Sequence, residues 1–199
     1  MKIILIGASG TIGRAIDHEL KDRHQIVRVG RNSGELQVDI TDPASIRRLF
    51  EQTGPFDALI SAAGNGHFGP LEELTAKEFA VGLADKLMGQ VNLVLIGREF
   101  ANDGASFTLT SGVLSEDPIR FGSALSMVNA AVDGFVRGAA IELPRGLRIN
   151  SVSPTVLEES LPSYGPYFRG FKAVPAATVA LAYAKSAEGR QTGQVYRVL

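Results

Sequence analysis

The stretch Ile3-Ile4-Leu5-Ile6-Gly7-Ala8-Ser9-Gly10-Thr11-Ile12-Gly13 decides the fold of this chain. Its four consecutive aliphatic residues predict a strand buried on both faces, as in a parallel sheet with helices on either side. The glycines that follow allow a tight turn, and the spacing from Ile12 to Leu20 predicts a helix after it. Because amides at a helix start bind phosphate, we expect a seat for a dinucleotide pyrophosphate. An ordinary glycine-rich turn between strand and helix is the alternative.

The composition of the chain narrows its class. It has 199 residues, of which 45% are hydrophobic, which is enough for one full core. A formal net charge of -1 and the lack of a basic block argue against nucleic acid as a partner. The chain has no cysteine, and its three histidines do not pair at metal-ligand spacing. We therefore expect neither a disulfide nor a metal site.

No part of the sequence predicts export or a membrane. The buried strand begins directly after Met1-Lys2, so we expect no signal peptide. We also identify no apolar run that is long enough to span a bilayer. These observations predict a soluble cytoplasmic protein without a membrane partner.

The next strand, predicted at 25–29, ends near an arginine that bears on cofactor choice. Arg31 lies 18 residues past Gly13, where dinucleotide-binding folds select the group on the adenosine ribose. An acidic residue there accepts from a free hydroxyl, whereas an arginine binds a phosphate through charge-assisted hydrogen bonds. Arg31, with the small polar Asn32 and Ser33, therefore predicts NADP rather than NAD. The alternative is a solvated loop arginine.

Strands and helices alternate along the rest of the chain. Further strands are predicted at 36–40, 56–60, 105–109, 147–152 and 193–198. Helices are predicted at 44–52, 75–102, 123–143 and 176–187, and a proline-containing segment at about 155–175 is expected to cover the site. The alternation predicts an α/β fold, a single Rossmann-like domain over 1–199 with a doubly wound parallel sheet in three layers.

Short motifs occur in a fixed order along the chain. They are Gly7-Ala8-Ser9-Gly10-Thr11-Ile12-Gly13, Val38-Asp39-Ile40-Thr41-Asp42, Ser61-Ala62-Ala63-Gly64, Leu109-Thr110-Ser111-Gly112 and Arg148-Ile149-Asn150-Ser151-Val152-Ser153-Pro154. The helical segment from Asn129 to Leu143 adds to them. Together they resemble the short-chain dehydrogenase/reductase family over nearly the whole chain. The chain is shorter than most members, mainly after its second strand and after Pro154.

The resemblance implies roles in binding a nicotinamide dinucleotide. Asp39 and Ile40 would hold the adenine, although an aspartate there is also typical of a turn or a helix start. The pyrophosphate would lie on the turn, at Gly7, Ser9, Gly10, Thr11, Ile12 and Gly13. The ribose would be backed by Ala62, Ala63 and Gly64, and the nicotinamide edged by Pro154, Thr155 and Val156.

The catalytic residues match the family only in part. Ser111 stands where the family has the serine that hydrogen-bonds the substrate carbonyl, although it could simply satisfy local backbone. The family also needs a tyrosine and a lysine four residues apart on the next helix, and Leu125 and Asn129 stand there instead. Neither can move a proton, and a positioned acid contributes about 10²- to 10⁴-fold. Asn129 remains assigned to the cofactor site.

Lys86 is the first candidate for the missing function. It stands where the family has an asparagine on the preceding helix, three residues before Gly89. Burial lowers the pKa of an amine, so a lysine in the cleft could supply the cation or the proton. The alternative, which we rank higher from sequence, is a surface lysine paired with Glu78 or Asp85.

Other candidate acids lie in loops. His67 follows the fourth strand and titrates near neutral pH, although a loop histidine more often makes only a local bond. Tyr164, Tyr167 and Lys172 belong to the covering segment and could reach the nicotinamide.

Three functions follow from these observations. The first is an NADP(H)-dependent oxidoreductase that acts on a small carbonyl or alcohol through a non-standard proton relay. The second is an NADP(H)-binding sensor or regulatory subunit without turnover. The third, a methyltransferase, is disfavoured by Arg31, because that class prefers an acidic residue there. The resemblance also implies a homodimer or homotetramer formed through the two long helices.

Overall fold

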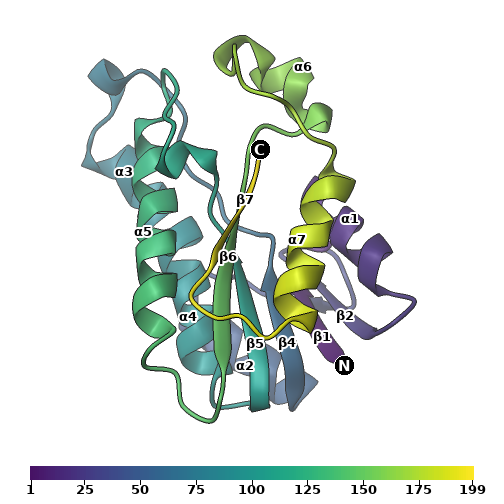
Figure 1. Ribbon diagram of the computed structural model, residues 1–199. Helices are drawn as coiled ribbons and strands as arrows, with labels where there is room; N and C mark the ends of the chain where they lie inside the picture. The colour runs from purple at the N-terminus through teal and green to yellow at the C-terminus, as the bar shows by residue number, and fades with distance from the viewer.

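The computed structural model describes residues 1–199, which form one sheet of seven parallel strands in the order β3-β2-β1-β4-β5-β6-β7. The chain starts in the middle of the sheet and winds outward in both directions (Figure 1). This order confirms the predicted doubly wound α/β fold. The strands are β1 (Lys2–Ile6), β2 (Gln25–Gly30), β3 (Leu36–Gln37), β4 (Phe56–Ser61), β5 (Ala101–Thr110), β6 (Arg148–Pro154) and β7 (Val195–Val198).

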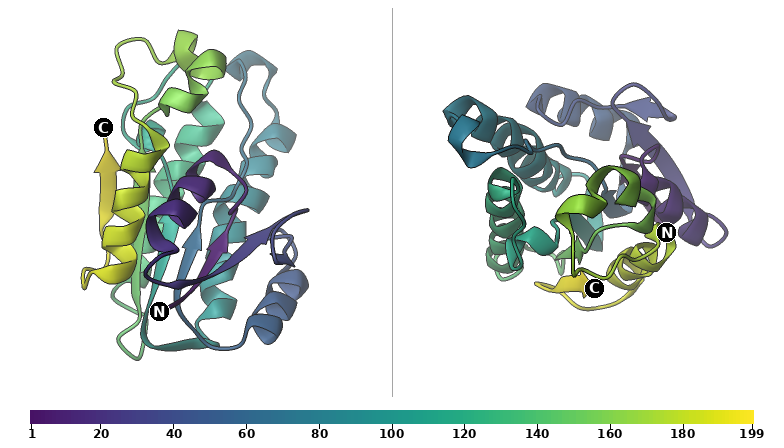
Figure 2. Two further views of the ribbon diagram at one scale, coloured as in Figure 1. Left: turned by 90° about the vertical axis from the view of Figure 1, so that its right-hand side faces the viewer. Right: turned by 90° about the horizontal axis from the view of Figure 1, so that it is seen from above.

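The first strand explains how both faces of the sheet are covered. Successive strand residues point to opposite faces, so Ile3 and Leu5 belong to one apolar cluster and Ile4 and Ile6 to the other. Helices on the first face are α1 (Thr11–Leu20) and α7 (Ala176–Glu188), and those on the second are α2 (Pro43–Thr53), α4 (Met88–Gly97) and α5 (Ser123–Ala139). Figure 2 shows α1 and α7 side by side.

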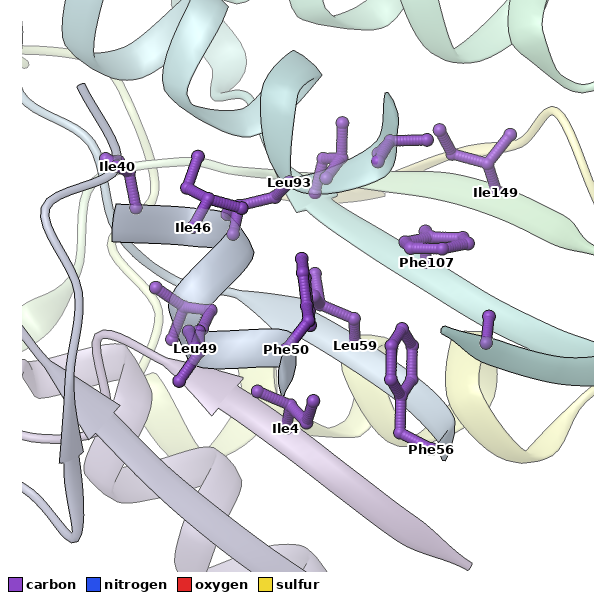
Figure 3. Packing of buried hydrophobic residues seen from close by; sticks show 14 of the residues in the cluster. Ile4, Ile40, Ile46, Leu49, Phe50, Phe56, Leu59, Leu93, Phe107 and Ile149 are labelled. Atoms are coloured by element: carbon purple, nitrogen blue, oxygen red, sulfur yellow. The ribbon is translucent and has the colours of Figure 1, made fainter. Parts of the chain in front are cut away.

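Aromatic side chains fill the centre of the second face. The rings of Phe50 and Phe56 stack with their centroids 5.6 Å apart, and Phe107 meets Phe56 edge-on at 5.9 Å. Figure 3 shows these rings on the face of the sheet formed by β1, β4 and β5, with Leu93 above them and Ile4 below them in that view. This packing fixes the strands whose carboxyl ends carry the site.

The turn between β1 and α1 depends on its glycines. Gly7 adopts a φ of +83°, which side chains disfavour. A Cβ at Gly13 would overlap the carbonyl oxygen of Gly7, so α1 begins as close to the strand as a backbone can come. The first amides of α1, which starts at Thr11 after Gly10, therefore face the carboxyl edge of the sheet.

The long helix predicted at 75–102 is divided into three parts. Thr75 and Glu78 form a capping box at the start of α3 (Ala76–Gly82), and α4 ends at Gly97. Between them, η2 (Leu83–Leu87) is a π-helical turn, a feature that occurs frequently at functional sites. The predicted end was wrong because Ala101 already pairs with Phe56 of β4, so residues after Gly97 belong to the approach to β5.

This helical stretch also bears on the membrane expectation. Within the 22 residues of Ala76–Gly97, an 18-residue window has a mean hydropathy of 1.4, so by length and composition this stretch is apolar enough to cross a bilayer. Our expectation that the chain holds no such run was therefore wrong. One such helix is weak evidence for a membrane, because a helix that packs in a protein core has the same composition, and α4 packs on the sheet through Leu93 and Val94. The cytoplasmic location stays a prediction.

The covering segment is folded rather than irregular. Its short helices are η4 (Glu158–Ser160), α6 (Leu161–Tyr164) and η5 (Gly165–Tyr167). Leu157 and Val174 pair at its base, and a carboxylate from Glu159 accepts from the amide of Ala176 at the start of α7. Seen from above in Figure 2, the segment lies over the carboxyl ends of the central strands. Its two ends are therefore fixed while its middle projects over the site.

Candidate functional site

Two cavities adjoin at the carboxyl edge of the sheet. The smaller has a volume of about 80 Å³ and lies between the glycine-rich turn and the end of β2. The larger has a volume of about 320 Å³ and lies beneath the covering segment. Gly64 and Asn65 line both, so one extended ligand can occupy the two cavities together.

Arg31 and Asp39 form the outer wall of the smaller cavity. Arg31 Nη2 lies 3.0 Å from Asp39 Oδ2, and the arginine side chain is 63% exposed. Hydrogen bonds from the hydroxyl and then the amide of Thr41 lower the pKa of Asp39, so its carboxylate stays ionised. The sequence placed Arg31 here as a phosphate ligand and Asp39 as an adenine ligand. Their pairing leaves the other guanidinium nitrogens of Arg31 free to face a ligand.

Two serines meet beside this arginine. Ser33 Oγ donates to Ser9 Oγ over 3.1 Å, which joins the loop after β2 to the glycine-rich turn. Arg14 of α1 donates to the carbonyl oxygen of Ser9, and Asn32 is exposed. Hydroxyls and guanidinium groups are donors that phosphate accepts. The polar groups predicted at 9 and 31–33 are therefore brought to one place.

The turn itself has the shape that a pyrophosphate requires. A Cβ at Gly7 would lie 2.7 Å from the carbonyl oxygen of Ala62, so the end of β4 backs the turn closely. Ala63, Gly64 and Ile40 line the smaller cavity, whereas Ala62 supports the turn from behind. These residues fit a bound dinucleotide, because bare backbone amides of the helix start face open space.

The larger cavity is neutral and mostly apolar. Thr155 and Val156, predicted to edge the nicotinamide, line it, while Pro154 stands at the end of β6 just before them. Leu125, at the family's tyrosine position, forms part of its wall and lies against Gly66. The lining residues are Gly64, Asn65, Gly66, Phe68, Leu114, Ile119, Leu125, Thr155, Val156, Leu157, Ser160, Tyr164 and Phe168.

Lys86 points into the protein, not to its surface. Its Nζ donates to the carbonyl oxygen of Ser111 over 3.1 Å, from the π-helical turn to the end of β5. Burial lowers the pKa of Lys86 to about 8, although the negative charges of Asp133 and Asp85 act to raise it. Gly64 makes room for it, because a Cβ there would lie 2.9 Å from Lys86 Cα. The surface lysine ranked higher from sequence is therefore wrong.

Gln90 is a site residue that the sequence analysis missed. Its buried amide donates to the carbonyl oxygens of Lys86 and Thr110, both over 2.9 Å, and accepts from the amide of Thr110 over 2.8 Å. These bonds fasten the π-helical turn to the end of β5 and so fix the distance from Lys86 to Ser111. A glutamine among the apolar residues of 88–97 was the available signal.

Two buried polar side chains of α5 complete this region. Asn129 is 4% exposed, its Nδ2 lies against Gly112, and its Oδ1 has no hydrogen-bond partner. Asp133 is 2% exposed, accepts from Ser151 Oγ over 2.7 Å through Oδ1, and has no partner at Oδ2. The cation of this region is Lys86, which belongs to the helical stretch that follows β4, while α5 contributes Asn129 and Asp133.

The remaining candidates are less well placed. Ser111 is buried, and its hydroxyl makes only a long bond of 3.5 Å to the carbonyl oxygen of Val152. His67 lines neither cavity; its ring lies against Gly69. The pKa of Glu78 is lowered chiefly by hydrogen bonds from Thr75 and least by the charge of His67.

The aromatic and basic residues of the covering segment lie in different places. Tyr164 lines the larger cavity, while Tyr167 packs on Phe68 above it. Lys172 faces a different cavity beside Glu116 and Arg197.

A doubly wound parallel sheet with a glycine-rich first turn and two adjoining cavities at its carboxyl edge defines a dinucleotide-binding protein of the Rossmann type. The family model described as enoyl-(acyl carrier protein) reductase matches residues 11–196. The chain therefore belongs to the short-chain dehydrogenase/reductase family, as its motifs predicted.

Solved structures agree with this assignment. The protein lin1944 from Listeria innocua shares 52% sequence identity with this chain, with a TM-score of 0.98 over 100% of both chains. A small-chain dehydrogenase solved in complex with NADPH shares 25% identity, with a TM-score of 0.88 over 100% of this chain and 96% of that one.

Curated relatives are more distant and longer. A 3-ketodihydrosphingosine reductase of Bacteroides thetaiotaomicron is 29% identical over 170 residues, which cover 76% of this chain and 62% of that protein. The hydroxynaphthalene reductase arp2 of Aspergillus fumigatus is 23% identical over 153 residues, or 72% of this chain and 56% of its own length. The chain thus spans little more than half the length of these relatives.

Proposed function

We propose that this protein is an NADP(H)-dependent oxidoreductase that acts on a small carbonyl or alcohol, with a proton relay that differs from the family's. The observation that carries the proposal is the buried ammonium group of Lys86, held at the carbonyl oxygen of Ser111. It returns a cation to the site although α5 carries Asn129 and Leu125 in place of lysine and tyrosine.

The cofactor assignment rests on the smaller cavity. Its outer wall carries Arg31, with Ser9 and Ser33 beside it, and these donors suit a phosphate on the adenosine ribose. A related small-chain dehydrogenase was solved with NADPH, which supports the same choice. When bound, the nicotinamide supplies or accepts a hydride.

The residues of this chain provide orientation and charge. Thr155 and Val156 border the larger cavity where the nicotinamide would lie, and the covering segment excludes water from it. Lys86 stabilises negative charge that develops on a substrate oxygen near Ser111 and holds a proton at its Nζ. His67 or a water molecule is the other source of that proton.

Two measurements test the proposal. The first compares the affinity of the protein for NADPH and NADH, and we expect NADPH to bind more tightly. Equal affinities would overturn the NADP assignment. The second follows NADPH oxidation with aldehydes, ketones and quinones, with Ser111→Ala and Lys86→Met as comparison variants. Tight NADPH binding without turnover across the panel would favour the sensor instead.

We also propose that α4 and α5 form the surface that joins copies of the chain into a homodimer or homotetramer. A hollow of about 270 Å³ lies between them, lined by Leu95, Phe135 and Leu143 and bordered by Arg98 and Glu142. Leu95 is 41% exposed, which is costly for a large aliphatic side chain unless a partner covers it. Sedimentation of wild-type protein and a Leu95→Arg variant tests this: we expect an oligomer and a monomer, respectively.

A further inference from the structure

The larger cavity offers no group that would neutralise a charged substrate. No Asp, Glu, Lys, Arg or His is among its lining residues, and the polar side chains there are Asn65, Thr155, Ser160 and the hydroxyl of Tyr164. A carboxylate or phosphate that entered would lose its water without gaining a partner, which is costly. Lys86 is not among the lining residues and donates to the carbonyl oxygen of Ser111. The guanidinium of Arg120 stacks on the ring of Phe121 without lining the cavity. The lining therefore favours an uncharged compound.

Four rings, those of Phe68, Phe121, Tyr164 and Tyr167, form an aromatic roof that borders the cavity through Phe68 and Tyr164. Phe68 is its centre, with ring centroids 6.2 Å from Phe121, 5.9 Å from Tyr164 and 4.9 Å from Tyr167. The four rings come from the loop after β4, the loop before α5 and the covering segment. Edge-to-face contacts therefore join three separate segments above one cavity.

The backbone beneath the aromatic roof is held in an unusual conformation. Phe121 has a φ of +68°, which is rare for a residue with a bulky side chain. Its carbonyl oxygen accepts from the amide of Gly69 over 3.0 Å, and the guanidinium of Arg120 lies 4.6 Å from its ring centre. Such a conformation persists only where its surroundings fix it. The ring of Phe121 is thus held in place, and its edge-to-face contact supports Phe68, which lines the cavity.

The proton supply restricts the substrate further. Leu125 occupies the wall where the family's tyrosine would stand, and it carries no hydroxyl. Reduction of an ordinary ketone forms a strongly basic alkoxide. A positioned acid that protonates this oxygen contributes about 10²- to 10⁴-fold to the reaction rate. Reduction of a quinone forms an aromatic anion that is a far weaker base. Such an anion can leave the site and take its proton from water.

We propose that the substrate is an uncharged, flat, electron-poor carbonyl compound of the quinone type, held beneath the aromatic roof. This inference rests on the proposed function. The quinone accepts a hydride, that is two electrons and one proton, from the reduced nicotinamide dinucleotide, which is oxidised. One further proton, from water or Lys86, completes the hydroquinone. Carbonyl carbon and oxygen stay joined, and no other group is transferred.

The first experiment compares three compounds of similar ring size with the wild-type protein and NADPH. Naphthoquinone is neutral and activated, naphthoquinone sulfonate is activated but charged, and alpha-tetralone is neutral but not activated. We expect kcat/KM for naphthoquinone to exceed that for tetralone by about 100-fold, because the ketone needs an acid in the cavity wall, where Leu125 offers none, and the quinone does not. It should exceed that for the sulfonate by about tenfold or more, although the sulfonate is intrinsically easier to reduce.

The second experiment tests the aromatic roof through a matched pair of variants. Phe68→Leu should raise KM for naphthoquinone about tenfold and leave the affinity for NADPH unchanged, because the lost ring contacts lie over the substrate. Phe79→Leu is the matched control: it removes a ring on α3 that lines neither cavity, and it should change neither value.

The outcomes separate this inference from the proposed function. Equal or faster reduction of the sulfonate, or of tetralone, would overturn the substrate class. So would tight NADPH binding without reduction of naphthoquinone, while the cofactor assignment would stand. Failure to bind NADPH would overturn the proposed function itself.

Discussion

The two ends of the site differ in how they are built. The adenosine end comes mainly from residues 6–40, with 63–65 and Asp85 completing its cavity, and its polar groups bond to near neighbours such as Asp39 to Thr41. The catalytic end joins Lys86 and Gln90 to Ser111 at the end of β5 and to residues of α5, which are three segments distant in sequence. Gln90 and Ser111 are buried, and Lys86 is partly buried.

The two ends therefore depend on their surroundings to different degrees. Backbone amides and an exposed guanidinium bind phosphate with little demand on their surroundings, so the adenosine end keeps the family's pattern. A buried charge depends on every neighbour that desolvates or pairs it. Lys86 reaches the end of β5 beside Gly64, where a Cβ would lie 2.9 Å from Lys86 Cα, and its carbonyl oxygen accepts from Gln90.

We expect the largest effect from a variant that restores the family's residues at the catalytic end. A variant with Lys86→Asn, Leu125→Tyr and Asn129→Lys places a hydroxyl in the cavity wall beside a lysine on α5. We expect NADPH-dependent reduction of alpha-tetralone to rise by about 10²-fold, the usual worth of a positioned acid. A steady-state assay of NADPH oxidation measures it.

The matched control for this variant carries Phe instead of Tyr at position 125, with the other two changes kept. It has the ring but no hydroxyl, so it should gain nothing. An equal gain in both variants would show that cavity shape, rather than the proton donor, limits the reaction.

The pH dependence of turnover tests the role of Lys86 at the catalytic end. The pKa of Lys86 is about 8, so its ammonium form dominates below that pH and is lost above it. We expect carbonyl reduction to fall as pH rises through about 8, by about tenfold at one unit above it. In Lys86→Met this decline should be absent, and a decline of equal size in that variant would assign the titration to another group.

At the adenosine end, we expect Arg31→Ala to reduce the affinity for NADPH and to leave the affinity for NADH unchanged. Removal of the guanidinium should weaken NADPH binding about tenfold, because the side chain is largely exposed and solvent screens its charge. NADH binding should stay unchanged, and turnover at saturating NADPH should be retained. Fluorescence titration with both cofactors measures the two affinities. A parallel loss for NADH would mean that Arg31 supports the turn rather than the phosphate.

The smallest expected effect is on stability. Because burial lowers the pKa of Lys86, the folded protein carries a cost below pH 8 that disappears as pH rises toward 10.5. Lys86→Met removes that cost, so near neutral pH it should raise the melting temperature by a few degrees, at about 2–4 °C per kcal/mol. The gap between variant and wild type should narrow from pH 8 upward. A gap that widens with pH would contradict the assigned burial.

Local patterns in the sequence were enough to predict the parallel sheet, and they also led to the proposed adenosine end. A run of four aliphatic residues, a glycine-rich turn and an amphipathic helix are local patterns, and they predicted β1, the turn and α1 together. Arg31 followed from its distance to Gly13. Element ends were predicted less well: 36–40 forms a strand only at Leu36–Gln37, and the helix predicted to 143 ends at Ala139, because pairing and packing decide such ends.

Only the tertiary structure decided the catalytic end. Lys86 has the same sequence neighbours whether its amine points to water or inward, and the glycine at 64 and the glutamine at 90 that direct it inward act through space. The aromatic roof likewise joins rings more than 40 residues apart, such as Phe68 and Phe121. Burial and contact between distant segments set the charge and shape of this end, and those are properties of the folded chain.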